Sequence, residues 1–190
     1  MKPIENFDQI KTISEAEKLP AGGYIVDIMG AEEVTYSWGS VLEIRFDIAE
    51  GEYKDYFVNQ YTNTQLENKK YKGTYRMNIP KDDGSDKDEW TGRKFKSDII
   101  AIEESNPSFR WDWNEKLLAG KKVGAIFFEK EYDFEGKQGF FTTVHSLKPV
   151  DAIKNGKFKI PNPKLLGEKK PSPVKLYEIN VGDDELPFKV

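Results

Sequence analysis

The chain has 190 residues, of which 37% are hydrophobic and 33% charged, and its formal net charge is -4. This length suits one domain with an appendage better than two full domains. The absence of cysteine excludes disulfides, thiolate zinc sites and thiol nucleophiles. No apolar run approaches the ~20 residues that a membrane span needs, so we expect a soluble intracellular protein without membrane contact.

The first part of the chain predicts an arm and a three-stranded meander. Residues 1–19 mix apolar, acidic and lysine side chains, and we expect them to form a short arm that packs on the domain. A first strand is predicted at residues 24–29. Residues 42–48 alternate apolar and charged side chains, which predicts a second strand with one face on a core. Residues 54–61, aromatic and apolar after a glycine turn, predict the third.

The next segment combines an extended stretch, a polar loop and a helix. Residues 72–80 are predicted to be extended, with a proline at their end. Residues 81–89 have the composition of a solvated loop, without the alternating ligands of a calcium-binding loop. Residues 94–105 predict the best helix of the chain, because apolar residues recur on one face and a proline follows.

The last strands form a predicted hairpin. A fourth strand at residues 121–132 and a fifth at residues 138–147 flank a segment, 133–137, that has hairpin-turn chemistry. Residues 149–156 predict one helical turn that ends at a glycine. From residue 157 prolines recur among lysines, which is typical of an extended linker.

Together these elements predict a mainly β protein with three strands, an insertion that contains a helix, and a two-stranded hairpin. This is the order of the OB-fold, a five-stranded Greek-key barrel, with the helix between strands three and four. An SH3-like barrel or a sandwich remains open, but neither naturally places a helix there. The predicted domains are an N-terminal arm (1–19), an OB-fold domain (20–156), and a flexible linker with a tail (157–190).

The C-terminus carries clustered acids followed by Leu-Pro-Phe, which could be drawn to a basic patch and anchored by its phenylalanine. It resembles the acidic tip of bacterial single-stranded-DNA-binding proteins. The body, especially residues 121–159, is similar in pattern to phage-encoded single-stranded-DNA-binding proteins of Gram-positive hosts. The resemblance implies protection of single strands during DNA replication or recombination in the cytoplasm of a bacterial host, with recruitment of replication or recombination proteins by the tip. The tip residues are Asp183, Asp184, Glu185, Leu186, Pro187 and Phe188.

The tip departs from the bacterial family in one respect. In that family the phenylalanine is the last residue and its carboxylate takes part in binding. Here Lys189 and Val190 follow, so the carboxylate lies two residues further on and Lys189 adds an opposing charge. This departure affects the expected recruitment of partners more than the expected DNA binding. The alternative for the tail is a solvated segment that aids solubility.

Sequence-independent binding of single strands needs aromatic faces for base stacking beside cations that follow the phosphates. Trp38, in the predicted loop between strands one and two, is the leading stacking candidate. Arg45 is expected on the polar face of strand two, where it could instead pair with Glu43 or Asp47. The full set of predicted DNA-binding residues is Tyr36, Trp38, Arg45, Lys54, Tyr56, Tyr75, Arg76, Trp90, Arg93, Lys94, Phe134 and Lys137.

Other aromatic residues have structural interpretations. Trp111 and Trp113 are expected either to clamp the predicted helix onto the domain or to lie on the surface. Four phenylalanines on predicted strands are expected in the core, namely Phe46, Phe57, Phe127 and Phe140.

Catalysis is not expected. His145 is the only histidine, and no cysteine or nucleophile motif accompanies it. The glycine pair at residues 22–23 lacks the Lys-Ser/Thr of a phosphate-binding loop. The leading hypothesis is a non-enzymatic binder of single-stranded DNA without metal or cofactor. The rival is a protein-interaction adaptor whose barrel binds a protein, and both hypotheses leave a homo-oligomer open.

Overall fold

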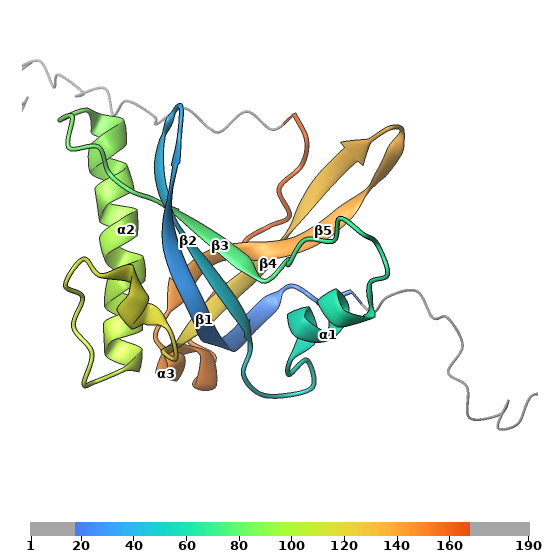
Figure 1. Cartoon of the computed structure of the whole chain (residues 1–190), viewed down its shortest axis with the longest axis horizontal. Helices are drawn as coiled ribbons and strands as arrows, with labels where there is room; N and C mark the ends of the chain where they lie inside the picture. The colour runs from blue at the N-terminus through green and yellow to red at the C-terminus, as the bar shows by residue number, and fades with distance from the viewer. Residues whose placement is uncertain (1–17, 168–190) are drawn as a thin grey trace, which may run out of the picture.

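Figure 1 shows the computed structural model of the chain, in which residues 18–167 are described. The predicted mainly β class is confirmed. In chain order the elements are β1 (Gly22–Tyr36), β2 (Gly39–Ile48), α1 (Tyr56–Asn63), β3 (Thr74–Asn78), α2 (Asp86–Ser105), the 3-10 helix η2 (Glu115–Leu118), β4 (Lys122–Phe134), β5 (Lys137–Lys148) and α3 (Val150–Lys154). Among residues 18–167, no helix combines the length and apolar character that crossing a membrane requires.

The five strands form one antiparallel sheet in the order β3-β2-β1-β4-β5. One side of the sheet encloses the core, where Ile44, Phe46 and Phe127 are each at most 2% exposed. Phe57 joins this core from α1. The apolar positions of residues 42–48 therefore face inward, as their alternation predicts.

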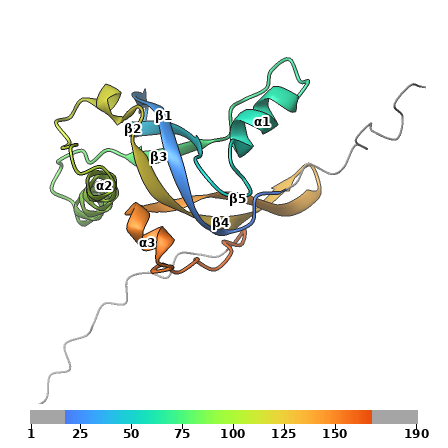
Figure 2. The same cartoon turned by 90° about the horizontal axis from the view of Figure 1, so that it is seen from below.

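Strand β1 changes partner along its length, and this bends the sheet. Its first residues, 22–27, pair with β4, whereas residues 26–36 pair with β2. The register with β2 shifts between Ile28 and Gly30, and the intervening Met29 is 55% exposed. Such a bulge increases the local twist. In Figure 2, the first half of β4 lies beside β1, and the outer part of the β4–β5 hairpin runs across the direction of β1 and β2.

The strand predicted at residues 54–61 is wrong, because most of these residues form α1. The Asp47 carboxylate on β2 accepts hydrogen bonds from the backbone N–H groups of Phe57 and Val58, at 2.9 and 2.8 Å. N–H groups in the first turn of a helix have no partner inside it, so Asp47 stabilises this helix start from the neighbouring strand. The third strand is β3, which lies within the extended stretch predicted at residues 72–80.

Helix α2 confirms the helix predicted at residues 94–105, but it begins at Asp86, inside the predicted loop. The Ser85 hydroxyl caps it by accepting a hydrogen bond from the Asp88 N–H at 3.2 Å. Acidic side chains fill the first turn, where they interact favourably with the positive end of the helix dipole. These acids therefore stabilise a helix end, which composition alone does not distinguish from a solvated loop.

The sheet is not closed into the predicted barrel, since β3 and β5 are its two edges and share no ladder within residues 18–167. Helix α2 contacts both edge strands instead. In the chain it follows β3 and precedes β4, as predicted for the helix between strands three and four. Its Asp98 carboxylate accepts hydrogen bonds from the Tyr75 hydroxyl on β3 at 2.7 Å and from the Leu147 N–H on β5 at 3.0 Å. A buried side chain of the helix thus takes the place of direct pairing between the two edges.

Strands β4 and β5 form the predicted hairpin, whose turn residues Glu135 and Gly136 both have positive φ, 50° and 76°. The outer half of this hairpin extends beyond β1, which pairs only with β4 residues 122–127. Phe140 lies in that outer half and is 38% exposed. Its predicted place in the core is therefore wrong, because Phe140 lies beyond Gly22, where the ladder between β1 and β4 stops.

The two tryptophans after α2 pack around Phe95 of that helix. The centroids of the Trp111 and Trp113 rings lie 6.5 and 6.2 Å from the centroid of Phe95, and Trp113 is stacked on it. Trp111 is partly buried, whereas Trp113 is 72% exposed. Both residues thus clamp the helix, and Trp113 also lies on the surface.

Helix α3 confirms the helical turn predicted at residues 149–156. Residues 157–167, which have a linker composition, lie against the sheet. A Cβ on Gly23 would come within 2.6 Å of the Phe158 ring, and Lys164 forms backbone hydrogen bonds with Glu129 and Glu131 of β4. Most of the predicted arm and the acidic tip, Asp183 to Phe188, lie outside the described residues.

Candidate nucleic-acid interface

The β1–β2 hairpin carries two predicted stacking residues at its tip. Tyr36 pairs with Gly39, so Ser37 and Trp38 form a two-residue loop. The rings of Tyr36 and Trp38 are stacked, with centroids 5.2 Å apart and planes inclined by 4°. Tyr36 is 37% and Trp38 56% exposed. The hairpin therefore presents to solvent the kind of aromatic face on which an unpaired base stacks.

The outward side of β2 and β3, which we call the β2–β3 face, consists of Glu43, Arg45, Thr74 and Arg76. The register places Arg45 opposite Thr74 and Glu43 opposite Arg76, so these side chains share one side of the sheet. The Arg76 Nε donates to a Glu43 carboxylate oxygen at 2.7 Å. This hydrogen bond raises the pKa of the Arg76 guanidinium, with a smaller contribution from Tyr36. The Tyr36 contribution indicates that the tyrosine hydroxyl lies in the neighbourhood of the Arg76 guanidinium.

Arg45 pairs with Glu32 on β1, at 3.7 Å, and not with Glu43 or Asp47. Those two carboxylates already serve Arg76 and the start of α1. Arg45 and Arg76 have side-chain exposures of 51% and 59%. The Arg45–Glu32 pair is exposed on both sides and contributes only about 0–1 kcal/mol, so a phosphate can compete with Glu32 for Arg45. Glu43 is 16% exposed, so its hydrogen-bonded pair with Arg76 holds that guanidinium more firmly.

Two lysines that the sequence analysis does not predict to bind DNA lie near Trp38. A cleft of about 130 Å³, which we call the Trp38 cleft, separates the β1–β2 tip from the N-terminal end of α2. Lys81 and Lys87 line it together with Asp88. The Asp88 carboxylate accepts a hydrogen bond from the Lys81 N–H at 2.7 Å. The sequence does not predict this cleft, because only the folded sheet brings the hairpin tip beside α2.

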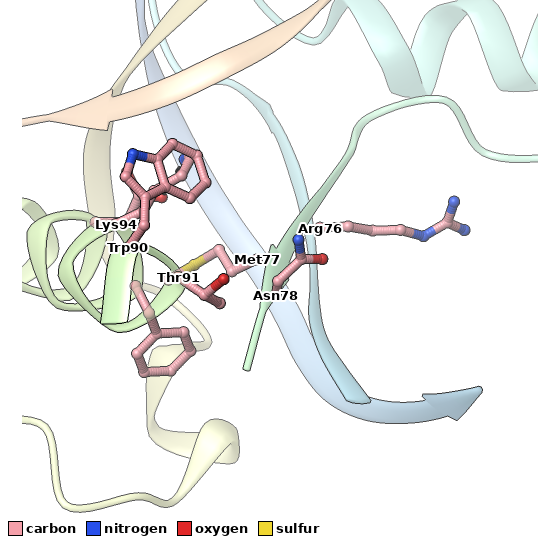
Figure 3. Close-up of a pocket in the computed structure, with 8 residues that line it drawn as sticks. Arg76, Met77, Asn78, Trp90, Thr91 and Lys94 are labelled. Carbon is pink, nitrogen blue, oxygen red and sulfur yellow. Dashed lines mark hydrogen bonds and ion pairs between the residues drawn. The ribbon is translucent and has the colours of Figure 1, made fainter. Parts of the chain in front are cut away.

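The predicted residues of α2 lie on the other side of β3 from the β2–β3 face. In Figure 3, Trp90 and Lys94 extend from the helix beside Met77, whereas Arg76 points away from them. Trp90 is 60% exposed. It is available as a stacking surface. Trp90, Lys94 and Arg76 line one pocket of about 40 Å³, although the Arg76 side chain points away from the helix.

Lys94 and Tyr75, both predicted to contact DNA, belong instead to the network around Asp98. The Lys94 ammonium lies 2.9 Å from the Asp98 carboxylate and also donates to the Tyr75 hydroxyl. Tyr75 is 7% exposed, and burial together with Asp98 raises the pKa of its hydroxyl. These contacts hold α2 on the sheet. Tyr75 is therefore covered, whereas the Lys94 side chain is 36% exposed beside Trp90. Arg93 is exposed and pairs with Glu89 one helical turn earlier.

Lys54 and Tyr56 do not lie on the sheet, because the chain leaves it to form α1. Lys54 is exposed in the turn before the helix, and Tyr56 is the first helical residue. The Tyr56 hydroxyl accepts a hydrogen bond from the Leu19 N–H at 3.2 Å, and its ring packs edge-on against Phe57. Their predicted position on the third strand is therefore wrong.

Phe134 and Lys137 face each other at the tip of the β4–β5 hairpin, and Phe134 is 68% exposed. Figure 1 shows this tip and the β1–β2 tip projecting toward the same side of the molecule, with β3 between them. The structure therefore brings Tyr36, Trp38 and Arg76 together and places Phe134 on a separate projection.

No protein-family model matches the sequence, and no curated protein matches it significantly. Within residues 18–167, no group of three acidic or histidine side chains is arranged to hold a metal ion. The interface combines the exposed rings of Tyr36 and Trp38 with Arg45, whose ion pair is exposed on both sides, and with Lys81 and Lys87, which form no ion pair within residues 18–167.

Proposed function

We propose that this protein binds single-stranded DNA without sequence preference and protects it during replication or recombination, while its acidic tip recruits partner proteins. The observation that carries the proposal is the exposed stack of Tyr36 and Trp38, beside Arg76 and the lysines of the Trp38 cleft. Rings for bases and cations for phosphates are the two requirements for binding single strands.

The strand order supports the proposal. In an OB-fold, strand one pairs with strands two and four, and strands three and five meet to close the barrel. The order β3-β2-β1-β4-β5 is the order of such a barrel opened between β3 and β5. We infer that the domain is an open form of the OB-fold. Its DNA would lie across β2 and β3 between the two hairpin tips, where OB-folds bind oligonucleotides.

Titration of a fluorescent oligothymidine with the full-length protein at two salt concentrations tests the proposal. We expect affinity to fall as salt rises, because neutralised phosphates release counterions. Trp38→Ala should weaken binding by ~1–3 kcal/mol through the loss of one stacked base. Trp113→Ala is the matched control, because it removes an exposed ring that packs on α2. Affinity that is insensitive to salt, or equal for duplex DNA, contradicts the proposal.

A second function, that of a protein-interaction adaptor, is favoured by the charge pairing on the β2–β3 face. Glu32 and Glu43 lie against the two arginines that would otherwise be free for phosphates. Deletion of residues 182–190 separates the two functions. A DNA-binding protein retains oligothymidine binding without its tail, whereas an adaptor binds no DNA with or without it.

A further inference from the structure

The two edge strands of the sheet, β3 and β5, diverge beside α1, and a second aromatic surface lies between them. A groove of about 680 Å³, which we call the α1–β5 groove, is bounded by α1, residues 71–74 and β5. It lies where the β3–β5 ladder of a closed barrel would run, so the edge strands leave backbone N–H and C=O groups without a strand partner. The rings that line it are Tyr56, Phe57, Tyr71, Tyr132, Phe140 and Phe141.

Three of these rings come from the outer half of the β4–β5 hairpin and are exposed. Tyr132, Phe140 and Phe141 are 39%, 38% and 42% exposed. The Tyr132 and Phe141 rings are tilted neighbours, with centroids 6.4 Å apart. Tyr132 lies over Gly139, where a Cβ would come within 2.9 Å of its hydroxyl oxygen. Phe140 and Phe141 are successive residues of β5, so their side chains point to opposite sides of the hairpin. Tyr132 and Phe141 therefore form one exposed aromatic surface, which is typical of a binding site.

Lysines accompany the rings. The Lys130 ammonium lies 5.8 Å from the centroid of Phe141, and the Lys18 ammonium lies 5.9 Å from that of Phe140. Lys18 also pairs with Glu129 at 2.7 Å. Lys72 lines the groove, is exposed, and forms no ion pair with any residue of the described part of the chain. The groove therefore places positive charge within reach of the phosphates on either side of a stacked base.

The groove is continuous with the β2–β3 face. Thr74 belongs to both, since it lines the groove and lies opposite Arg45 in the ladder between β2 and β3. A chain that crosses this face from Trp38 past Arg76 and Arg45 reaches Thr74 and then enters the groove. The order of elements thus traces one path from the β1–β2 tip to the β4–β5 hairpin.

We propose that single-stranded DNA continues from the β2–β3 face into the α1–β5 groove. There a base stacks on the Phe141 ring beside Tyr132, and the neighbouring phosphates lie near Lys72, which lines the groove, and Lys130, which lies beside Phe141. This inference rests on the proposed function and adds a second stacking site to it. Duplex DNA does not satisfy the site, because its bases are already stacked within the helix.

Affinity measurements with the full-length protein test the groove. Phe141→Ala should weaken oligothymidine binding about 5- to 150-fold, the range expected when one base loses its aromatic partner. Phe141→Trp should retain binding, because an indole also stacks. Trp113→Ala is again the matched control, and circular dichroism verifies that each variant is folded.

The outcomes separate this inference from the proposed function. If the wild-type protein does not bind oligothymidine, both fail. If Trp38→Ala weakens binding but Phe141→Ala behaves like the Trp113→Ala control, the function stands and the groove is overturned as a DNA site. A loss for Phe141→Ala that Phe141→Trp does not share supports the groove.

A photochemical experiment identifies the occupant directly. Phe141 is replaced by p-benzoylphenylalanine in the full-length protein, which is then irradiated with labelled oligothymidine. We expect a covalent adduct with the oligonucleotide. Cross-links to residues 1–17 or to a second copy of the chain, in the presence of saturating oligothymidine, would show a different occupant and overturn the inference.

Discussion

Asp47 and Asp98 are the buried charged side chains of residues 18–167, with exposures of 5% and 2%. Asp47 accepts backbone N–H groups at the start of α1, and Asp98 is bonded to Tyr75, Lys94 and Leu147. A buried carboxylate is tolerated only when it has such partners. Each residue therefore fixes one helix on the sheet, and the two helices in turn bound the α1–β5 groove and the Trp38 cleft.

Asp98→Asn keeps the size of the side chain but exchanges one oxygen acceptor for an amide donor. We expect the free energy of unfolding to fall by about 2–4 kcal/mol, because the buried donors on β3 and β5 lose their charged acceptor. Urea denaturation measures this loss. Glu104→Gln, an exposed change on the same helix, should alter stability by less than about 0.5 kcal/mol. Equal stabilities for the two variants would show that Asp98 does not bridge the sheet edges.

At the scale of elements, two glycines that lie at or in helices differ in the room that a side chain would have. Gly124 lies in β4 under α3, where a Cβ would meet the Ile153 Cγ1 at 2.4 Å and the Lys148 carbonyl oxygen at 2.8 Å. Gly92 lies within α2, where the nearest atom to such a Cβ is 3.9 Å away. The first glycine permits α3 to approach the sheet, whereas the second only weakens a helix.

Alanine at these two positions should have opposite effects on stability. Gly124→Ala is expected to lower the free energy of unfolding by about 1–3 kcal/mol, because α3 has to move. Gly92→Ala is expected to raise it by about 0.5–1 kcal/mol through better helix propensity. Thermal unfolding of both variants gives the comparison. Destabilisation by Gly92→Ala would indicate a close contact that the structure does not contain.

For the molecule as a whole, buried and partly buried tyrosines make the free energy of unfolding depend on pH in the alkaline range. Burial raises the pKa of Tyr24 to about 12, with smaller contributions from Tyr53 and Glu52. Burial also raises the pKa of Tyr71 and of Tyr75, each next to an aspartate. The folded chain therefore holds these phenolic protons more tightly than the unfolded chain, in which the tyrosine pKa is about 10.

Titration of these tyrosines should consequently not change the free energy of unfolding below about pH 10, where they are protonated in both the folded and the unfolded chain. The free energy of unfolding should fall as pH rises toward 12. Urea midpoints measured across this window, together with tyrosinate absorbance, test the expectation. Tyr24→Phe should reduce the steepness of the decline, because one linked proton is removed. An unfolding midpoint that stays constant throughout the window would contradict it.

The sequence by itself determined the features that depend on neighbouring residues. Alternation at residues 42–48 identifies β2, apolar spacing at residues 94–105 identifies most of α2, and turn chemistry at residues 133–137 places the β4–β5 hairpin. The same local reasoning predicted Trp38 and Phe134 as exposed rings on hairpin tips, and both are exposed. Each of these features follows from backbone periodicity or turn geometry, which short segments carry in their own composition.

Only the tertiary structure decided the features that depend on contacts between segments far apart in the chain. Residues 54–61 have aromatic spacing compatible with either a strand or a helix, and the Asp47 carboxylate ten residues from Phe57 selects the helix. Asp98 keeps β3 and β5 bridged without a ladder, which opens the α1–β5 groove and exposes Phe140. Such contacts depend on where whole elements pack, and local periodicity contains no information about that packing because each partner comes from another part of the chain.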